Sequence, residues 1–202
     1  MNNYFIHNHK YYYMSRKTYV INLIGGPSCG KSVMAAILFA KLKINKNKYL
    51  VEYVQEYAKY LVWTKQFDIL NNQHYVTQYQ YKLLKQMDGH VDFIITDGPL
   101  IQGMYYNMHN KDNISNVERT EKYMVDSHSE FNNINIFLNR GNHEYEVQGR
   151  LQTEEESKEI DVILKHLLKQ KGIEFTIFDA SADDINVNKI IDFIEKKVEM
   201  VK

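Results

Sequence analysis

Short apolar runs alternate with longer amphipathic stretches along most of the chain. Five runs rich in β-branched or aromatic residues predict strands, at positions 18–24, 49–54, 92–96, 134–138 and 174–178. The first run is almost continuously apolar, as is typical of a strand that is covered on both faces. Strands of this kind belong to parallel sheets, so the pattern indicates one.

Helical periodicity occupies the stretches between these runs. Residues 33–42 form one such pattern, and in residues 70–87 apolar positions recur every three or four residues. Thr153 and Glu156 have the spacing of a capping box, so a helix is expected from there to about residue 170. The alternation of strands and helices predicts an α/β fold, with helices on both faces of a parallel sheet.

The composition fits one compact globular domain. The chain has 202 residues, of which 44% are hydrophobic and 25% are charged, and about 100–200 residues is usual for a domain. The first 17 residues contain no Asp or Glu. Residues 1–17 are therefore expected to form a flexible leader, and residues 18–202 a single domain.

Charge and cysteine content argue against several classes of protein. Lys plus Arg equals Asp plus Glu, at 25 each, which argues against a nucleic-acid-binding protein held by bulk positive charge. The single cysteine, Cys29, excludes a disulfide within the chain and favours a reducing compartment, so a cytoplasmic protein is expected. No apolar run is long enough to span a membrane.

The segment after the first predicted strand carries the strongest motif. It reads GGPSCGKS, which fits the phosphate-loop pattern G-x-x-x-x-G-K-[ST] between a strand and a helix. Its glycines let successive backbone N–H groups point at phosphate oxygens, and the helix adds its positive N-terminus. Lys31 is expected to reach the β- and γ-phosphates, and Ser32 to ligate Mg²⁺. The residues expected to bind ATP are Gly25, Gly26, Pro27, Ser28, Cys29, Gly30, Lys31, Ser32 and Val33.

A phosphate loop does not name a reaction, and three classes of protein compete. A GTPase would need an Asn-Lys-x-Asp segment after a strand, whereas residues 110–113 read NKDN and follow no predicted strand. A mechanical ATPase would need a strand that ends in Asp-Glu, whereas the strand at 92–96 runs into Asp97-Gly98. Asp97 still supplies the carboxylate expected beside Mg²⁺, which a kinase also needs. The pattern therefore favours a kinase.

Carboxylates that follow the second predicted strand suit a kinase. Glu52 and Glu56 fall where that strand ends, and parallel strands bring such ends to the crevice above the phosphate loop. Either one can orient an acceptor hydroxyl and accept its proton, and the sequence does not choose between them. Both also fit the alternative of solvated acids at the start of a helix.

Two arginines bracket a polar segment after the fourth predicted strand. Arg140 and Arg150 flank it, so residues from about 139 to 153 are expected to form a lid that closes over the phosphates. The alternative is that both are ordinary surface arginines.

Three further sets of side chains have two interpretations each. Aromatic residues that could stack on a base, or form a core-facing helical stripe, are Tyr53, Tyr57, Tyr60 and Trp63. Amides that could read a base edge, or lie on a polar helix face, are Gln73, Gln78 and Gln80. Histidines without metal-ligand spacing, expected at the surface or in the lid, are His109, His128, His143 and His166.

These motifs together resemble the NadR-like family of P-loop kinases, which comprises nicotinamide riboside kinase domains and small phage and viral relatives. The matching segments are GGPSCGKS, EYVQEY, ITDGPL and RGNHEYEVQGRLQTEEE, and the likeness is strongest to the phage-type branch. The resemblance implies a five-stranded parallel sheet in the order 2-3-1-4-5, Mg²⁺ and ATP as cofactors, and transfer to a nucleoside-like hydroxyl. Gln55 departs from the riboside kinases, which carry Arg there.

The sequence therefore predicts an ATP-dependent P-loop kinase that phosphorylates a nucleoside- or nucleotide-like small molecule. In this hypothesis Lys31 binds phosphate, Ser32 and Asp97 hold Mg²⁺, and the carboxylates and arginines above complete the catalytic set. The alternatives are a non-kinase NTPase or switch that acts through a protein partner, and a kinase acting on a modified DNA base. The neutral net charge gives the DNA alternative no support, and the sequence leaves the oligomeric state open.

Overall fold

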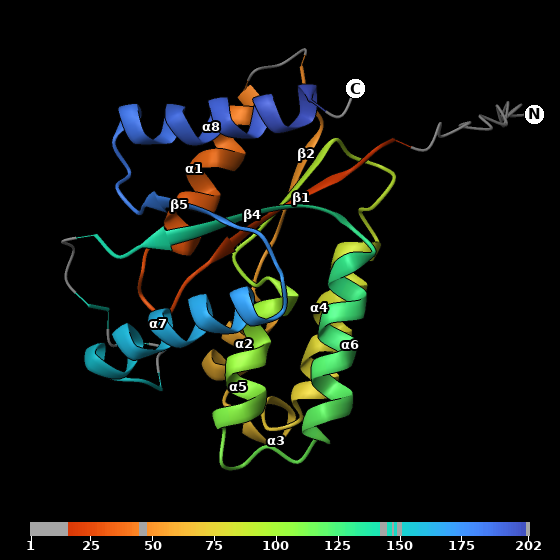
Figure 1. The fold of residues 1–202 in the computed structure, drawn as a ribbon, viewed down its shortest axis with the longest axis vertical. Coiled ribbons are helices and arrows are strands. Elements are labelled where there is room, and N and C mark those ends of the chain that lie inside the picture. The colour runs from red at the N-terminus through yellow and green to blue at the C-terminus, as the bar shows by residue number, and fades with distance from the viewer. Residues whose placement is uncertain (1–15, 45–47, 142–144, 147, 149–150, 201–202) are drawn as a thin grey trace, which may run out of the picture.

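A sheet of five parallel strands runs through the centre of the computed structural model, which describes residues 16–44, 48–141, 145–146, 148 and 151–200 (Figure 1). The spatial order β2-β3-β1-β4-β5 confirms the expected P-loop α/β fold with strand order 2-3-1-4-5. All four neighbouring pairs are parallel. The strands are β1 (Tyr19–Ile24), β2 (Val51–Val54), β3 (Phe93–Thr96), β4 (Asn132–Asn139) and β5 (Thr176–Asp179).

Helices cover both faces of the sheet, as the alternation of elements predicts. In Figure 1, α1 and α8 lie on one side of the strands and α4 to α7 on the other. The helical segments are α1 (Lys31–Ile44), α2 (Tyr57–Trp63), α3 (Phe67–Leu70), α4 (Gln73–Lys85), the 3₁₀ turn η1 (Leu100–Gln102), α5 (Gly103–His109), α6 (Val117–Ser129), α7 (Glu154–Gln170) and α8 (Asp184–Glu199). Within the described ranges, no helix has the length and apolar character that crossing a bilayer would require.

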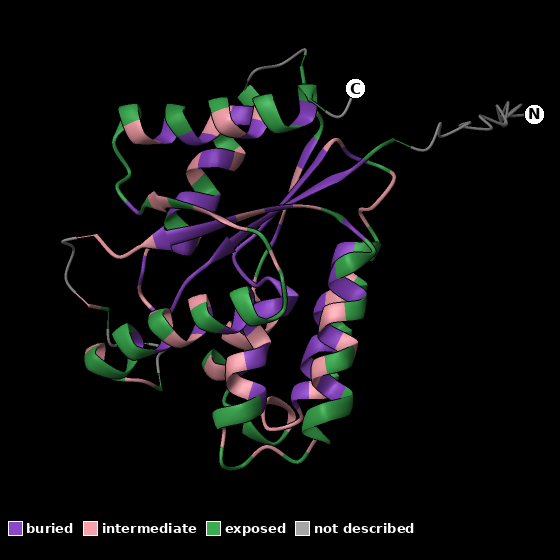
Figure 2. Ribbon diagram, in the orientation of Figure 1, coloured by how far each residue is buried: buried purple, intermediate pink, exposed green. Residues whose placement is uncertain are grey.

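Side chains alternate along β1 between two separate parts of the core. Tyr19, Ile21 and Leu23 pack in the cluster that contains residues of α1 and α8. Val20 and Ile24 pack in the clusters on the opposite face. Because successive side chains of a strand point to opposite faces, a strand between two helical layers is expected to be mostly apolar, and the buried Asn22 is the exception within β1. Figure 2 accordingly shows the central strands buried along their length.

The helical pattern at residues 70–87 is interrupted in the structure. Asn72 caps α4, because its side chain accepts a hydrogen bond of 3.0 Å from the Tyr75 backbone N–H, and the helix therefore begins at Gln73. The capping box of Thr153 and Glu156 is present as expected and opens α7. Each strand lies within two residues of its predicted ends.

Parallel strands place all their carboxyl ends at one edge of the sheet. The phosphate loop follows β1, Glu56 follows β2, Asp97 follows β3 and Arg140 follows β4. Ligands of open α/β sheets bind at this edge, so the fold brings together residues from four separate segments of the chain.

Candidate active site

The phosphate loop connects β1 to α1 in the backbone conformation that its glycines allow. Gly25 and Gly30 have φ angles of 153° and 96°, and the non-glycine Ser28 lies in the left-handed region at 56°. The Lys31 side chain is buried, and its Nζ donates to the carbonyl oxygens of Gly25 at 2.7 Å and Gly26 at 2.9 Å. The ammonium thus folds back over the loop, where it can meet the phosphates of a nucleotide.

A hydroxyl and a carboxylate meet where a P-loop protein binds its metal ion. Ser32 Oγ donates to Asp97 Oδ2 at 2.5 Å, and Asp97 is only 2% exposed. Both are hard oxygen donors, so this pair fits Mg²⁺. Burial, together with the charge of Asp97 and a hydrogen bond to it, raises the pKa of Tyr53 well above its ordinary value. The Tyr53 phenol therefore stays protonated beside this carboxylate.

Asp97 also fixes the start of α2. Its Oδ1 accepts a hydrogen bond of 3.0 Å from the Glu56 backbone N–H. The two segments approach so closely that a Cβ at Gly98 would lie 2.6 Å from Glu56 Cα. Gln80 of α4 adds two bonds, because its Oε1 accepts from the Tyr57 N–H and its Nε2 donates to the Gln55 carbonyl. Glu56 is therefore held by its backbone from both sides.

The structure places Glu52 and Glu56 in different environments, whereas the sequence did not distinguish them. Glu52 pairs with Lys43 at 2.9 Å on the surface, and its side chain is 45% exposed. Glu56 instead lines a cavity beside the phosphate loop. The geometry brings Glu56 together with Lys31 and leaves Glu52 outside.

This cavity has a volume of about 660 Å³ and lies between the phosphate loop and the helices α2, α3, α5 and α7. We call it the acceptor cavity. Pro27 and Lys31 belong to its wall, so it opens directly from the place where phosphates bind. Its further lining includes aromatic, amide and charged side chains, among them Lys59, Phe67, Gln73, Gln102, Tyr105 and Glu156.

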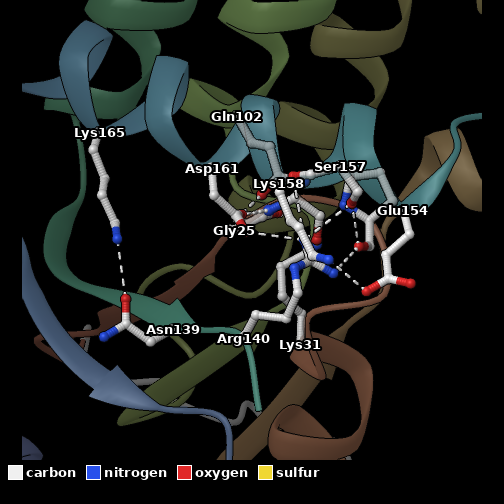
Figure 3. Close-up of polar contacts among 12 residues, drawn as sticks. Gly25, Lys31, Gln102, Asn139, Arg140, Glu154, Ser157, Lys158, Asp161 and Lys165 are labelled. Carbon is white, nitrogen blue, oxygen red and sulfur yellow. Dashed lines mark hydrogen bonds and ion pairs between the residues drawn. The ribbon is translucent and has the colours of Figure 1, made fainter. Parts of the chain in front are cut away.

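Arg140 lies on the other side of the phosphate loop, not over the acceptor cavity. Its Nη1 donates to the Pro27 carbonyl at 2.8 Å, and its Nη2 contacts Asp161 at 2.9 Å and Ser157 Oγ at 3.0 Å (Figure 3). Its side chain is 13% exposed, and its Nε has no hydrogen-bond partner among the described residues. In this structure Arg140 ties the loop to α7, and its expected part in a lid stays a prediction. Arg150 lies outside the described residues, as does part of the expected lid segment.

Two residues of α7 complete this contact, and the sequence did not single them out. Ser157 Oγ donates to the Pro27 carbonyl at 2.6 Å, and Asp161 Oδ1 accepts from the Gly26 N–H at 2.5 Å. A Cβ at Gly26 would lie 2.6 Å from the Ser157 carbonyl oxygen, so the second glycine permits the close approach of α7. The available signal was the spacing of four residues, which puts Ser157 and Asp161 on one helix face.

A second cavity of about 500 Å³ lies on this side of the loop. Ser28, Arg140 and Asp161 line it together with Tyr145. The phosphate loop is therefore flanked by two cavities, one on each side.

The aromatic and amide candidates fall into different environments. Tyr60 and Trp63 are exposed, and neither they nor Tyr57, which stacks on Tyr79 with ring centres 4.0 Å apart, line the acceptor cavity. Gln78 is exposed, and Gln80 is buried in the backbone contacts described above. Gln73 is buried and lines the acceptor cavity.

His128 corrects an expectation, because it is buried and not at the surface. Burial lowers its pKa to about 4, so it is neutral at neutral pH. His143 lies outside the described residues. Among the residues that the structure describes, no group of three His, Cys, Asp or Glu side chains could hold a metal ion.

The fold and the loop define a P-loop nucleotide-binding protein of the α/β class. A family model described as an AAA domain matches residues 20–184, so the chain belongs to that family. A search of curated proteins found no match.

Two of the solved structures that match this chain illustrate the shared fold. The YorR protein of Bacillus subtilis, in complex with phosphorylated GDP, is 17% identical with a TM-score of 0.57, and the match covers 89% of this chain and 98% of that one. Deoxyadenosine kinase of M. mycoides, with the products dCMP and dCDP bound, is 18% identical with a TM-score of 0.55, over 90% of this chain and 99% of that one.

Proposed function

We propose that this protein is an ATP-dependent kinase that transfers a phosphoryl group to a hydroxyl of a nucleoside-like small molecule. The observation that carries the proposal is the acceptor cavity, which opens beside Lys31 and has Glu56 in its wall. Its volume lies within the range of about 300–1,000 Å³ that is usual for small-molecule sites. A protein that only hydrolyses a nucleotide needs room for water at this place, and the cavity is far larger.

Each part of the reaction has a residue that suits it. Lys31 and the loop N–H groups bind the phosphates, and Ser32 with Asp97 would hold Mg²⁺, which neutralises charge on them. Glu56 orients the acceptor hydroxyl and accepts its proton as the oxygen attacks the terminal phosphorus atom. The leaving ADP stays in the loop. The cavity lined by Tyr145 and Arg140 is the place proposed for the base of ATP.

The charge of the acceptor cavity supports an acceptor without a phosphate group. Of the described residues, four carboxylates lie in its wall, Glu56, Asp112, Glu156 and Glu159, against three lysines, Lys31, Lys59 and Lys111. One of these lysines is already assigned to the phosphates of ATP. No arginine lines this cavity within the described part of the chain. A nucleoside would therefore suit the site better than a nucleoside monophosphate, whose two negative charges would meet carboxylates.

Relatives in fold and in motifs support the same class of reaction. One of the structures that share the fold is a deoxyadenosine kinase, and the motifs resemble the NadR-like kinases. We place the chain beside the phage-type members of that group.

The direct test is phosphoryl transfer from ATP to a panel of acceptors, followed by chromatography of the products. The panel contains nucleosides, nucleoside monophosphates and nicotinamide riboside, and a reaction without acceptor is the control. We expect transfer to at least one nucleoside, little hydrolysis without acceptor, and preference for ATP over GTP. Fast hydrolysis that no acceptor stimulates would contradict the proposal and favour a non-kinase NTPase.

A further inference from the structure

A second lysine faces the phosphate loop from the side of the acceptor cavity. Lys59 lies in the first turn of α2, and its Nζ donates to Ser32 Oγ at 3.3 Å. It also lines the acceptor cavity together with Lys31 and Glu56. We propose that Lys59 is a second phosphate-directed cation, which binds the terminal phosphate of the nucleotide and stabilises it during transfer. This inference rests on the proposed nucleotide site and adds a residue to it.

The surroundings of Lys59 leave its charge available. The Ser32 hydroxyl donates its proton to Asp97 and accepts from Lys59, so the lysine meets that carboxylate only through the serine. Among the described residues, Lys59 forms no ion pair with a carboxylate, and its side-chain hydrogen bond is with Ser32. A half-buried ammonium group placed in this way is a good binder of phosphate oxygens.

Binding of a nucleotide with its metal ion would change the charges around the Lys59 ammonium group. A divalent cation held by Ser32 and Asp97 would repel the ammonium from its present contact, because like charges at this distance oppose each other strongly. A phosphate chain in the loop brings anionic oxygens to the same place. The shift of Lys59 from Ser32 to the terminal phosphate therefore needs only a change of side-chain conformation.

Two other cations near the site differ from Lys59 in position. Arg140 is bound to Pro27, Ser157 and Asp161 on the opposite side. Lys111 lines the acceptor cavity from the segment between α5 and α6. Among the cations of the described residues that line this cavity, Lys59 and Lys31 are therefore the two that also contact the phosphate loop.

The backbone around Lys59 is fixed, so its side chain starts from a defined position. The helix α2 begins between the bond from Glu56 N–H to Asp97 and the bond from Tyr57 N–H to Gln80. A site built on an anchored helix holds a cation within reach of the transferred group without a large conformational change.

The first test measures binding and not activity. Dissociation constants for Mg·ADP and for Mg²⁺ with a non-hydrolysable ATP analogue are measured by calorimetry for the wild type, Lys59→Met and Lys59→Arg. Lys82→Met, which removes an exposed lysine of α4 outside the cavity, is the matched control. We expect Lys59→Met to lose about tenfold in its preference for the triphosphate analogue, Lys59→Arg to keep most of it, and Lys82→Met to keep all of it. An unchanged preference in Lys59→Met would overturn the inference.

The second test separates this inference from the proposed function. The same variants are assayed for acceptor-dependent transfer, where Lys59→Met should reduce kcat by about 10²-fold or more and leave the KM for the acceptor nearly unchanged. If the wild type transfers phosphate to no acceptor but Lys59→Met still loses the triphosphate preference, the kinase proposal fails and the role of Lys59 stands. If the wild type transfers phosphate and Lys59→Met matches it in both rate and preference, the kinase proposal stands and the role of Lys59 is wrong.

Discussion

The two sides of the phosphate loop are built in opposite ways. On one side, which we call the buttress, Arg140, Ser157 and Asp161 bind the backbone of Gly26 and Pro27 through short contacts. On the other side the acceptor cavity leaves about 660 Å³ open, with Glu56 and Lys59 in its wall. The buttress joins the loop backbone to α7 through paired groups, beside a cavity of about 500 Å³, whereas the other side presents polar groups to the acceptor cavity.

This difference follows from the conformational freedom of a glycine-rich loop. Its glycines give it the backbone angles that phosphate binding needs, but they also give it more conformational freedom to lose on folding. The buttress restricts that freedom from one side by fixing two of its carbonyl and N–H groups. The other side must stay open, because the acceptor has to enter there. Changes on the buttress should therefore alter stability first, and changes at the cavity should alter chemistry first.

Lys31→Ala is expected to have the largest effect, because Lys31 binds the phosphates of the nucleotide whatever residues the two sides of the loop contribute. Removing a phosphate-directed cation from the site should lower turnover by about 10³-fold or more. The fold should survive, since the hydrogen bonds of the Lys31 side chain within the described structure go to carbonyls of its own loop. Turnover is measured together with the circular dichroism spectrum. Turnover at the wild-type rate would contradict the assignment of the loop.

Arg140→Met tests the buttress. Removing one member of a buried ion pair leaves the charge of Asp161 without its partner, and we expect a loss of about 3 kcal/mol in the free energy of unfolding. Denaturation by urea measures this free energy. Lys158→Met is the matched control, because it breaks the exposed pair with Glu154 on the same helix and should change stability much less. Equal losses in the two variants would show that the buttress does not stabilise the loop.

Glu56→Gln and Glu52→Gln form a matched pair that tests the cavity side. The first variant loses the group that accepts the proton of the acceptor, so acceptor-dependent kcat should fall by about 10²-fold while ATP affinity is kept. The second loses only a surface pair with Lys43 and should keep nearly the wild-type rate. Steady-state kinetics with the best acceptor measures kcat for both variants. A larger loss of kcat in Glu52→Gln would show that Glu52, and not Glu56, is the carboxylate that serves the acceptor.

Thr153→Ala is expected to have the smallest effect and asks how far the buttress depends on the start of α7. Loss of the capping box should cost about 1 kcal/mol of stability. Asn116→Ala removes the cap of α6, away from the loop, and should cost a similar amount. If α7 holds the loop, only Thr153→Ala should also weaken ADP binding, which calorimetry measures. Equal ADP affinities in both variants would limit the buttress to Arg140 and its partners.

Local sequence was sufficient for the five strands, for the helices α1, α4 and α7, and for the loop, whereas it did not single out α2, α3, α5, α6 or α8. The β1 strand, the glycines after it and Lys31 are contiguous, so their conformation follows from neighbouring residues, and the capping box of α7 spans only four positions. Periodicity gave α4 but not its first residue, because Asn72 decides where the helix begins by a single side-chain bond. A helical spacing of apolar residues is also present in the sequence of α8, where the buried residues recur at intervals of three and four.

What the sequence by itself determined is therefore the class of fold and the identity of the phosphate-binding segment. Only the tertiary structure decided the roles of residues that meet across long separations in the chain. Glu52 and Glu56 look alike in sequence, and they differ because one meets Lys43 at the surface and the other meets the acceptor cavity. Arg140 flanks the expected lid in the sequence, and packing brings its side chain to Asp161 of α7. The physical reason is that contacts within a segment depend on its own backbone, whereas a site made of four strand ends depends on how the whole sheet is ordered.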